Sequence, residues 1–392
     1  MKSRYLELIA NLLFVILFPL TLILNYVAAL LSDEGLAFSN YGVLSAAASA
    51  IFLVCSMNAL KVVENNKMFF LLLFLFFYCL LWSFLNYLFN RNIFIAEAFS
   101  QSLGLVALWS GLVFIGLYLD SSARWFKMVN WGAAVFALIV TLVLMGQFKS
   151  AVVYTRVLSE SENTVGYQFL SRASLVVFMF SVFLCKRSGF ALFFAISGLV
   201  VLFSIGARSE LFSYMASLLV LSLFLALKNG LNLKIMTSAL LVMILGLVVV
   251  YDYSEQLLES RHAQIFELST SSSWKARQEL SESAERLIFS SPIFGDFGGN
   301  VTSEGRGGYA HNILSSWVSY GFLGFLLFSI SIFYPVFLSF HSFFKTKEYE
   351  ADLYFCAAMS LCVAIAIIFS KPVFWPMPAI VWGIALRLRP VS

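Results

Sequence analysis

Charge and histidine are scarce in this chain. Only 12% of its 392 residues are charged, whereas soluble domains carry about 25%. Histidine occurs three times, and the basic residues form no run. The low charge excludes an ordinary soluble globular protein, and the absence of a basic run argues against nucleic-acid binding.

Cysteine is also sparse, and its positions exclude two kinds of site. The five cysteines, Cys55, Cys79, Cys185, Cys356 and Cys362, all fall in or at the edge of apolar segments. None lies in the long polar stretch 253–308, so neither a disulfide framework nor a thiolate metal site is predicted. They are interpreted as small apolar core residues.

Apolar residues, in contrast, make up 61% of the chain, against about 45–50% in soluble domains. No soluble core buries so much apolar surface, so we predict an all-α polytopic membrane protein. The first apolar segment, 5–31, is too long for a signal peptide and lacks a small-residue cleavage site. It is therefore interpreted as a retained helix.

Twelve segments are apolar enough to be membrane spans: about 5–31, 41–63, 69–89, 95–119, 128–147, 166–185, 190–207, 210–227, 235–251, 310–340, 351–370 and 373–387. Seven alternate connections carry two basic residues each: Lys2/Arg4, Lys61/Lys67, Arg124/Lys127, Lys186/Arg187, Lys228/Lys234, Lys345/Lys347 and Arg387/Arg389. The other short connections are poorer in basic residues, so both termini are predicted to be cytoplasmic. Nine spans thus fall within 1–252, a large extracytoplasmic loop covers 253–308, and three spans follow within 309–392.

The long loop is predicted to be partly helical. Ser272-Ser273 can cap a run in which Trp274, Arg277, Leu280 and Ala284 recur at helical spacing. The helix is predicted to break at Ser291-Pro292, before a glycine-rich segment, 295–308. That segment matches no nucleotide-binding motif, so it is interpreted as a mobile lid or a close backbone approach.

His311 stands where this loop meets the next apolar span. The loop carries five cations: Arg261, Lys275, Arg277, Arg286 and Arg306. A titratable base beside cations suits chemistry on a membrane-borne anion. The alternative is an interfacial histidine that only bonds a backbone carbonyl. His262 and His341 are interpreted as incidental.

Arg208 is a charge at membrane depth, where the cost of insertion is about 2.5–3.5 kcal/mol. Within 190–227 the only other charged residue is Glu210. Arg208 either faces a polar cavity or snorkels at a tight outer turn beside Glu210. Arg172 has the same two alternatives. For Arg277 the alternative to a functional role is a solvated helix face.

Asp33-Glu34 is the acidic pair that must be weighed as a metal site. Carboxylates suit Mg²⁺ or Mn²⁺, but adjacent residues rarely ligate one ion and no third acidic residue is placed near them. No metal and no cofactor are therefore predicted.

Together these residues suggest a transferase that acts on a lipid diphosphate. A diphosphate leaving group gathers negative charge in the transition state, and arginine forks match phosphate oxygens. The acceptor hydroxyl needs a base that is active near neutral pH, and histidine fits. The energy must come from the substrate, because no nucleotide motif is present.

These motifs resemble those of the bacterial O-antigen polymerases (Wzy-type) and the related O-antigen ligases (WaaL-type). The residues that carry the resemblance are Gly206-Ala207-Arg208-Ser209-Glu210, Arg277, Glu285-Arg286, Ser291-Pro292-Ile293-Phe294-Gly295, Tyr309-Ala310-His311-Asn312-Ile313-Leu314-Ser315, Gly321 and Gly324. They cover residues 200–325, and the earlier part of the chain matches only in hydropathy. The number of spans and the late, large periplasmic loop also match.

The resemblance implies a metal-independent, inverting transferase of the GT-C-like type in the bacterial inner membrane. It would move a glycan from undecaprenyl diphosphate to the next lipid-linked repeat unit. It implies that Arg208 and Arg277 hold the diphosphate and that His311 is the base or orients the acceptor. Further substrate contacts are expected from Glu210, Arg286, Tyr309 and Asn312. A chain-length regulator is the implied protein partner.

Two rival functions remain. A ligase uses the same donor but delivers the glycan to lipid A core; its pattern has nine residues between His-Asn and the next glycine, whereas this chain has eight, 313–320. Tyr309 and Leu314-Ser315 are also more typical of the polymerases. A transporter of the same lipid would show paired broken helices and a repeat in each half, neither of which is evident.

Overall fold

The computed structural model describes residues 2–31, 66–90, 92–148, 166–185, 187–228, 272–304, 308–346 and 350–388. Within these ranges the regular structure is entirely helical and no strand occurs. Eight of the described helices are long and apolar enough to cross a membrane. The predicted class, an all-α polytopic membrane protein, is therefore confirmed.

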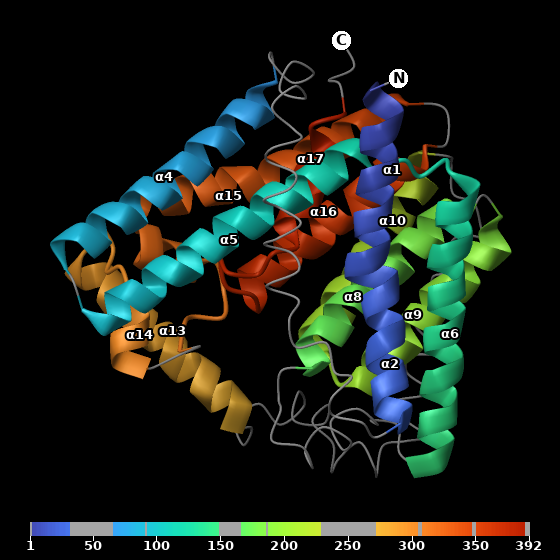
Figure 1. Cartoon of the computed structure of the whole chain (residues 1–392), viewed down its shortest axis with the longest axis horizontal. Coiled ribbons are helices and arrows are strands. Elements are labelled where there is room, and N and C mark those ends of the chain that lie inside the picture. Colours follow the sequence, from blue (N-terminus) through green and yellow to red (C-terminus); the bar gives the residue numbers. More distant parts are fainter. Residues whose placement is uncertain are drawn as a thin grey trace. The chain divides into compact units, whose positions relative to one another are not determined.

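Most predicted spans in the described ranges are helices (Figure 1). The elements are α1 (Lys2–Val15), the π-helical turn η1 (Ile16–Leu20), α2 (Thr21–Leu31), α4 (Lys67–Phe89), α5 (Ile93–Tyr118), α6 (Arg124–Phe148), α8 (Gly166–Leu184), α9 (Ser188–Ile205), α10 (Arg208–Lys228), α13 (Ser272–Ser290), α14 (Gly299–Glu304), α15 (Leu314–Lys345), α16 (Ala351–Phe369) and α17 (Pro378–Ala385). The apolar stretch of α8, Gln168–Leu184, is shorter than the eight candidate spans. The predicted spans 41–63 and 235–251 lie outside the described residues.

The predicted last span, 373–387, is corrected by the structure. Its first half is not helical, and α17 has only eight residues, about 12 Å at 1.5 Å per residue, against a hydrocarbon core of about 30 Å. The cause is proline: Pro372, Pro376 and Pro378 fall within seven residues, and proline in a helix interior removes a hydrogen bond and clashes with the preceding turn. Pro378 is tolerated because it begins α17.

Two compact units can be distinguished, and each is assembled from separate stretches of the chain rather than following its linear order. Unit 1 comprises Met1–Tyr41, Leu119–Leu268 and Phe343–Cys362. Unit 2 comprises Gly42–Tyr118, Ser269–Ser342 and Val363–Ser392.

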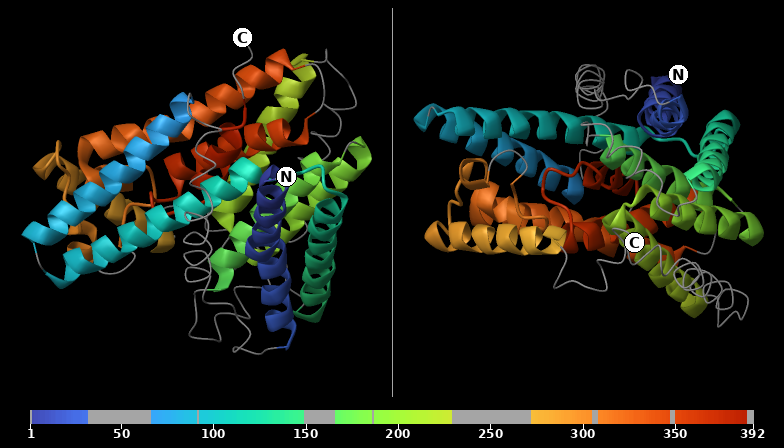
Figure 2. Two further views of the ribbon diagram at one scale, coloured as in Figure 1. Left: turned by 45° about the horizontal axis from the view of Figure 1, so that its top comes forward. Right: turned by 90° about the horizontal axis from the view of Figure 1, so that it is seen from below.

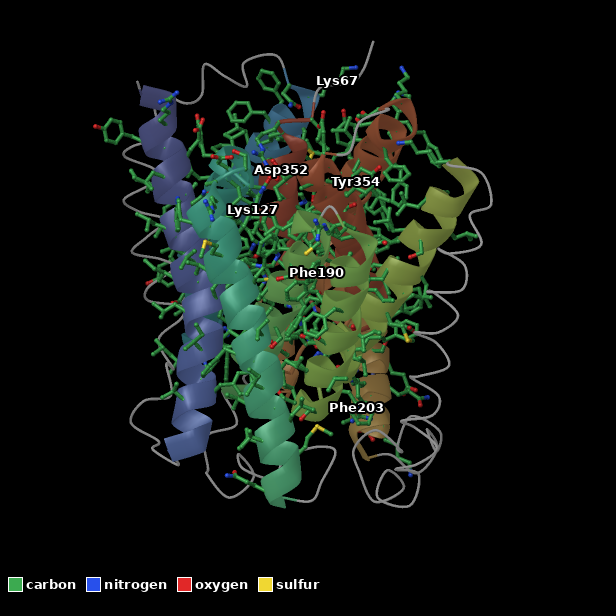
Figure 3. The ribbon with its side chains drawn as sticks, turned by 90° about the vertical axis from the view of Figure 1, so that its right-hand side faces the viewer. Lys67, Lys127, Phe190, Phe203, Asp352 and Tyr354 are labelled. Atoms are coloured by element: carbon green, nitrogen blue, oxygen red, sulfur yellow. The ribbon has the colours of Figure 1, made fainter. Side chains whose placement is uncertain are left out.

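Unit 1 has an aromatic core around α8. The ring of Phe180 on α8 packs on Phe14, Phe126 and Phe355, with centroid separations of 5.3, 5.5 and 4.5 Å. Figure 3 shows Lys127 and Asp352 toward one end of this unit and Phe203 toward the other. This order agrees with the alternation of connections that the basic residues predict; which end is cytoplasmic stays a prediction.

Unit 2 contains α4, α5, α13, α14, α17 and most of α15 (Figures 1 and 2). Its core lies where α5 packs on α17: the buried rings of Trp109 and Trp382 are 5.2 Å apart, and Trp382 Nε1 donates to Ser331 O at 2.8 Å. Gly116 and Gly383 let these helices touch, because a Cβ at either position would collide with the facing backbone. This packing joins α5, α17 and the middle of α15 within unit 2.

Candidate functional site

Helix α13 presents Arg277 beside the start of α15. The predicted helix is confirmed, and its apolar side, Ala284 and Ile288, is buried against Ala310 and Val318. Because apolar residues recur at helical spacing, this contact leaves Arg277 on the exposed side of α13. Arg277 is exposed, which agrees with its alternative interpretation as part of a solvated helix face, so its functional role stays a prediction.

Asn312 fixes the short connection that carries His311. Its Oδ1 accepts a hydrogen bond from the backbone N–H of Leu314 at 3.0 Å, and its Nδ2 donates to Ser281 Oγ on α13 at 3.5 Å. One side chain therefore starts α15 and ties it to the helix that carries Arg277. The predicted substrate contact of Asn312 remains a prediction, and the structure assigns the residue this positioning role.

Tyr309 links His311 to the non-helical segment 371–377. Its ring centroid lies 5.6 Å from that of His311 and 5.4 Å from that of Phe374. The contact is reinforced by Ser315, whose hydroxyl accepts a hydrogen bond from the backbone N–H of Val373 at 2.7 Å. The segment that follows α16 is thus a third part of the site, with α13 and the connection before α15.

Lys371 begins this third part and was not predicted as a site residue. Its backbone N–H donates to Ala366 O at 2.8 Å, and its Nζ lies 5.8 Å from the centroid of the Trp375 ring. The sequence holds one signal that could have identified it: a lone lysine directly before three closely spaced prolines, inside an otherwise apolar stretch. Such a pattern predicts irregular backbone with a charge attached, not a plain span.

Burial, with two neighbouring positive charges, keeps the imidazole of His311 neutral. Burial, then the positive charge of Arg277, then that of Lys371 lower the pKa of His311 from 6.5 to about 4. A histidine with this pKa is neutral near pH 7, so it can accept a proton or a hydrogen bond. The predicted proximity of His311 to a cation of the loop is therefore found, and a second cation comes from Lys371.

Two glycines of the motif pattern allow the backbone near residue 295 to lie directly against the backbone of α15. Gly295 (φ 69°) and Gly321 (φ 66°) have left-handed conformations, and Gly321 kinks α15. A Cβ at Gly295 would lie 2.5 Å from Val318 O, and one at Gly321 would collide with the carbonyl oxygen of Ile293. Backbone hydrogen bonds from Asp296 to Val318 (2.8 Å) and from Phe322 to Ile293 (3.0 Å) complete the junction. Of the two interpretations of the glycine-rich segment, close approach is correct at Gly295.

The other predicted site residues lie elsewhere. Arg286, further along α13, is exposed and is not among the groups that shift the pKa of His311. Arg208 and Glu210 belong to unit 1, at the start of α10 after the left-handed Gly206 (φ 79°). Glu210 is buried, and its Oε2 accepts from Ser209 Oγ at 2.7 Å. Their action on the same substrate as His311 remains a prediction.

Of the lone charges, Arg172 donates from Nη2 to Gln168 Oε1 at 3.3 Å and lies 5.6 Å from the Phe169 ring centroid. His341 is exposed and stacks on Phe337 at 5.9 Å, in agreement with an incidental role. Several predicted positions lie outside the described residues: Asp33, Glu34, Arg261, His262 and Arg306.

No group of three or more His, Cys, Asp or Glu side chains is placed to hold a metal ion in the described part of the chain. Neither a protein-family model nor a curated protein matches the chain. The relation to the O-antigen polymerases and ligases therefore rests on the motif resemblance.

Proposed function

We propose that this protein is a polysaccharide repeat-unit polymerase of the O-antigen type. It transfers a growing glycan from undecaprenyl diphosphate to the terminal sugar of another lipid-linked repeat unit, on the periplasmic side of the inner membrane. The observation that carries the proposal is a partly buried, neutral His311 beside two cations, Arg277 and Lys371, that come from different segments. The motif resemblance supports the choice of lipid and glycan.

The reaction follows from what a neutral imidazole can do. The oxygen of the acceptor hydroxyl attacks the anomeric carbon of the donor, and a new C–O bond forms as the bond from that carbon to the diphosphate oxygen breaks. The diphosphate leaves with the electron pair, and the proton of the hydroxyl passes to His311. Attack opposite the leaving group inverts the anomeric carbon, as the resemblance implies.

Donor binding strengthens His311 as a base. A pKa of about 4 makes the free imidazole a weak proton acceptor. A bound diphosphate places negative charge near Arg277 and Lys371, offsets their effect and raises the pKa of His311. The bound leaving group therefore makes His311 a stronger base.

The arginines supply the electrostatic stabilisation in place of a metal. A guanidinium fork binds two phosphate oxygens at once and keeps its charge at every physiological pH. The positive charge of Arg277 lowers the pKa of His311, which supports this role for Arg277. That Arg208 also binds the diphosphate of the donor is implied by the motif resemblance alone.

The second candidate function is the O-antigen ligase, which shares the arginines, the Pro-x-x-Gly turn and His-Asn. The eight-residue spacing from His-Asn to Gly321 favours the polymerase. Transport of the same lipid is less well supported, because it requires neither a base nor cations beside it.

Loss of the gene in its bacterial host distinguishes the candidates. A polymerase mutant leaves single repeat units attached to lipid A, which appear on a gel as one short lipopolysaccharide band. A ligase mutant leaves lipid A core bare, while polymer accumulates on undecaprenyl diphosphate. A transporter mutant keeps the repeat units on the cytoplasmic side. The first pattern is expected, and either of the others would overturn the proposal.

A further inference from the structure

The segment 371–377 is irregular backbone inside an apolar environment. It follows α16, and Val373, Trp375 and Met377 are almost completely buried, at 1%, 1% and 0% exposure. Non-helical backbone at membrane depth is tolerated only where it is buried in protein or lines a cavity. Lys371 opens this segment and is less buried than these three residues.

The segment is held firmly against the connection that carries His311. Val373 donates its backbone N–H to Ser315 Oγ, and the ring of Phe374 packs on Tyr309. At its start, the backbone of Lys371 is fixed to Ala366 O. These contacts fix the backbone that carries Lys371, and its Nζ lies 5.8 Å from the centroid of the Trp375 ring, so part of the ordering cost of binding is already met before any ligand arrives.

Lys371 and Arg277 bring two positive charges to one histidine from separate segments. Both lower the pKa of His311, so both ammonium and guanidinium groups lie within electrostatic reach of its imidazole. Like charges that converge on a partly buried site raise its potential, and an anion bound there is stabilised by both. Arg277 and Lys371 thus place two positive charges beside the neutral imidazole of His311.

We propose that Lys371 binds the diphosphate of the lipid-linked donor together with Arg277. This inference rests on the proposed function and extends it by a phosphate-binding residue that the motif resemblance does not include. Lysine supplies a compact charge with three donors, whereas arginine supplies a planar fork, so the two can contact different phosphate oxygens. As the bond to the anomeric carbon breaks, Lys371 stabilises the negative charge that the departing diphosphate gathers.

The test compares Lys371→Gln and Lys371→Arg with the wild-type protein in detergent. The probe is undecaprenyl diphosphate without sugar, and undecaprenyl monophosphate and inorganic pyrophosphate are run in parallel. Lys67→Gln is the matched control, because Lys67 is an exposed lysine in the first turn of α4. Loss of one charge-assisted contact predicts that Lys371→Gln weakens diphosphate binding about ten- to a hundredfold. Lys371→Arg restores part of it, and Lys67→Gln binds like the wild type.

Three results of this experiment would contradict a proposal. Wild-type protein that binds no undecaprenyl diphosphate would sink the proposed function itself. Wild-type binding that Lys371→Gln leaves unchanged would overturn the role of Lys371 alone. Dependence on Lys371 for inorganic pyrophosphate but not for the lipid would make this a site for free phosphate and would also overturn it.

A second readout separates binding from a merely structural role. Removing the positive charge of Lys371 raises the pKa of His311, whereas the burial and the charge of Arg277 remain. Tyr309, whose ring contacts His311, is unchanged in this variant. The acidic limb of the pH profile of kcat/KM should therefore move to higher pH in Lys371→Gln and stay in place in Lys371→Arg. A profile that does not move in Lys371→Gln would contradict the proposal.

Discussion

The hydroxyl of Ser315 joins the two segments that meet at His311: it accepts from Val373 N–H at 2.7 Å and donates to Asn312 O at 2.8 Å. Ser315→Ala removes both contacts and leaves a buried N–H without its acceptor, which costs about 1–3 kcal/mol. We predict a lower unfolding temperature and weaker binding of undecaprenyl diphosphate, because Lys371 is less firmly placed.

Ser316→Ala is the matched control for this prediction. Ser316 is equally buried, but among the described residues its hydroxyl bonds only Ile313 O in the same turn, at 2.7 Å. Thermal unfolding and lipid binding of the two variants should therefore differ. Equal effects on binding would mean that the contact with Val373 does not position Lys371.

Gly321→Ala is predicted to be strongly destabilising. Gly321 has φ 66°, and a Cβ there would lie 2.7 Å from the carbonyl carbon of Phe294 in addition to its collision with Ile293 O. Gly104→Ala in α5 is the control, since a Cβ there meets nothing within 4 Å and alanine favours a helix by up to about 1 kcal/mol. Unfolding temperatures in detergent check both. A Gly321→Ala protein as stable as Gly104→Ala would refute the close approach.

Arg277→Ala and Arg208→Ala are each predicted to abolish polymer while protein levels stay near normal. Each loses a charge-assisted contact to the diphosphate, worth about 1.5–3 kcal/mol in the ground state and more in the transition state. Lysine at either position should rescue only in part, because it keeps the charge but not the fork. Lipopolysaccharide gels measure the outcome, with Arg187→Ala, an exposed arginine before α9, as the control. Full activity of both lysine variants would exclude bidentate binding.

Activity is predicted to survive EDTA. In the proposed mechanism the cations that stabilise the leaving group are side chains, among them Arg277 and Lys371, and a chelator does not remove them. Polymer formation by purified protein should be unchanged after chelation and dialysis. Loss of activity with EDTA and its return with Mg²⁺ or Mn²⁺ would direct attention to Asp33 and Glu34 as ligands.

Local patterns in the sequence were reliable where local physics decides the structure. Helix α13 was predicted from its apolar spacing, and the break after Ser290 was predicted from Pro292. The place of Lys371 beside His311 could not be predicted, because tertiary packing of the segment after α16 creates it. The span 373–387 was predicted from its hydropathy although three prolines lie in or next to it, and this prediction was wrong. Gly321 was named from the motif pattern, but its close contact with Ile293 and Phe294 appears only in the folded chain.

The central claim is that neutral His311 takes the proton of the acceptor hydroxyl. Because the folded pKa is about 4, below the ordinary 6.5, the neutral form dominates at every pH above about 5, and it is lost only as the pH falls through 4. For the free enzyme, kcat/KM should therefore be flat from pH 8 to about pH 5 and fall below that. The acidic limb of the pH profile of kcat should lie at higher pH than that of kcat/KM, since bound diphosphate raises the pKa of His311.

The most direct measurement is single-turnover transfer by purified wild-type, His311→Ala and His311→Asn proteins, with donor binding measured on the same samples. Both variants should bind undecaprenyl diphosphate glycan like the wild type, while turnover falls by roughly 10²–10⁴, the usual contribution of a general base. Asparagine keeps a hydrogen bond but cannot take up the proton. If His311→Asn turned over like the wild type with the same pH profile, His311 would only orient the acceptor, and the proposed proton transfer would be wrong.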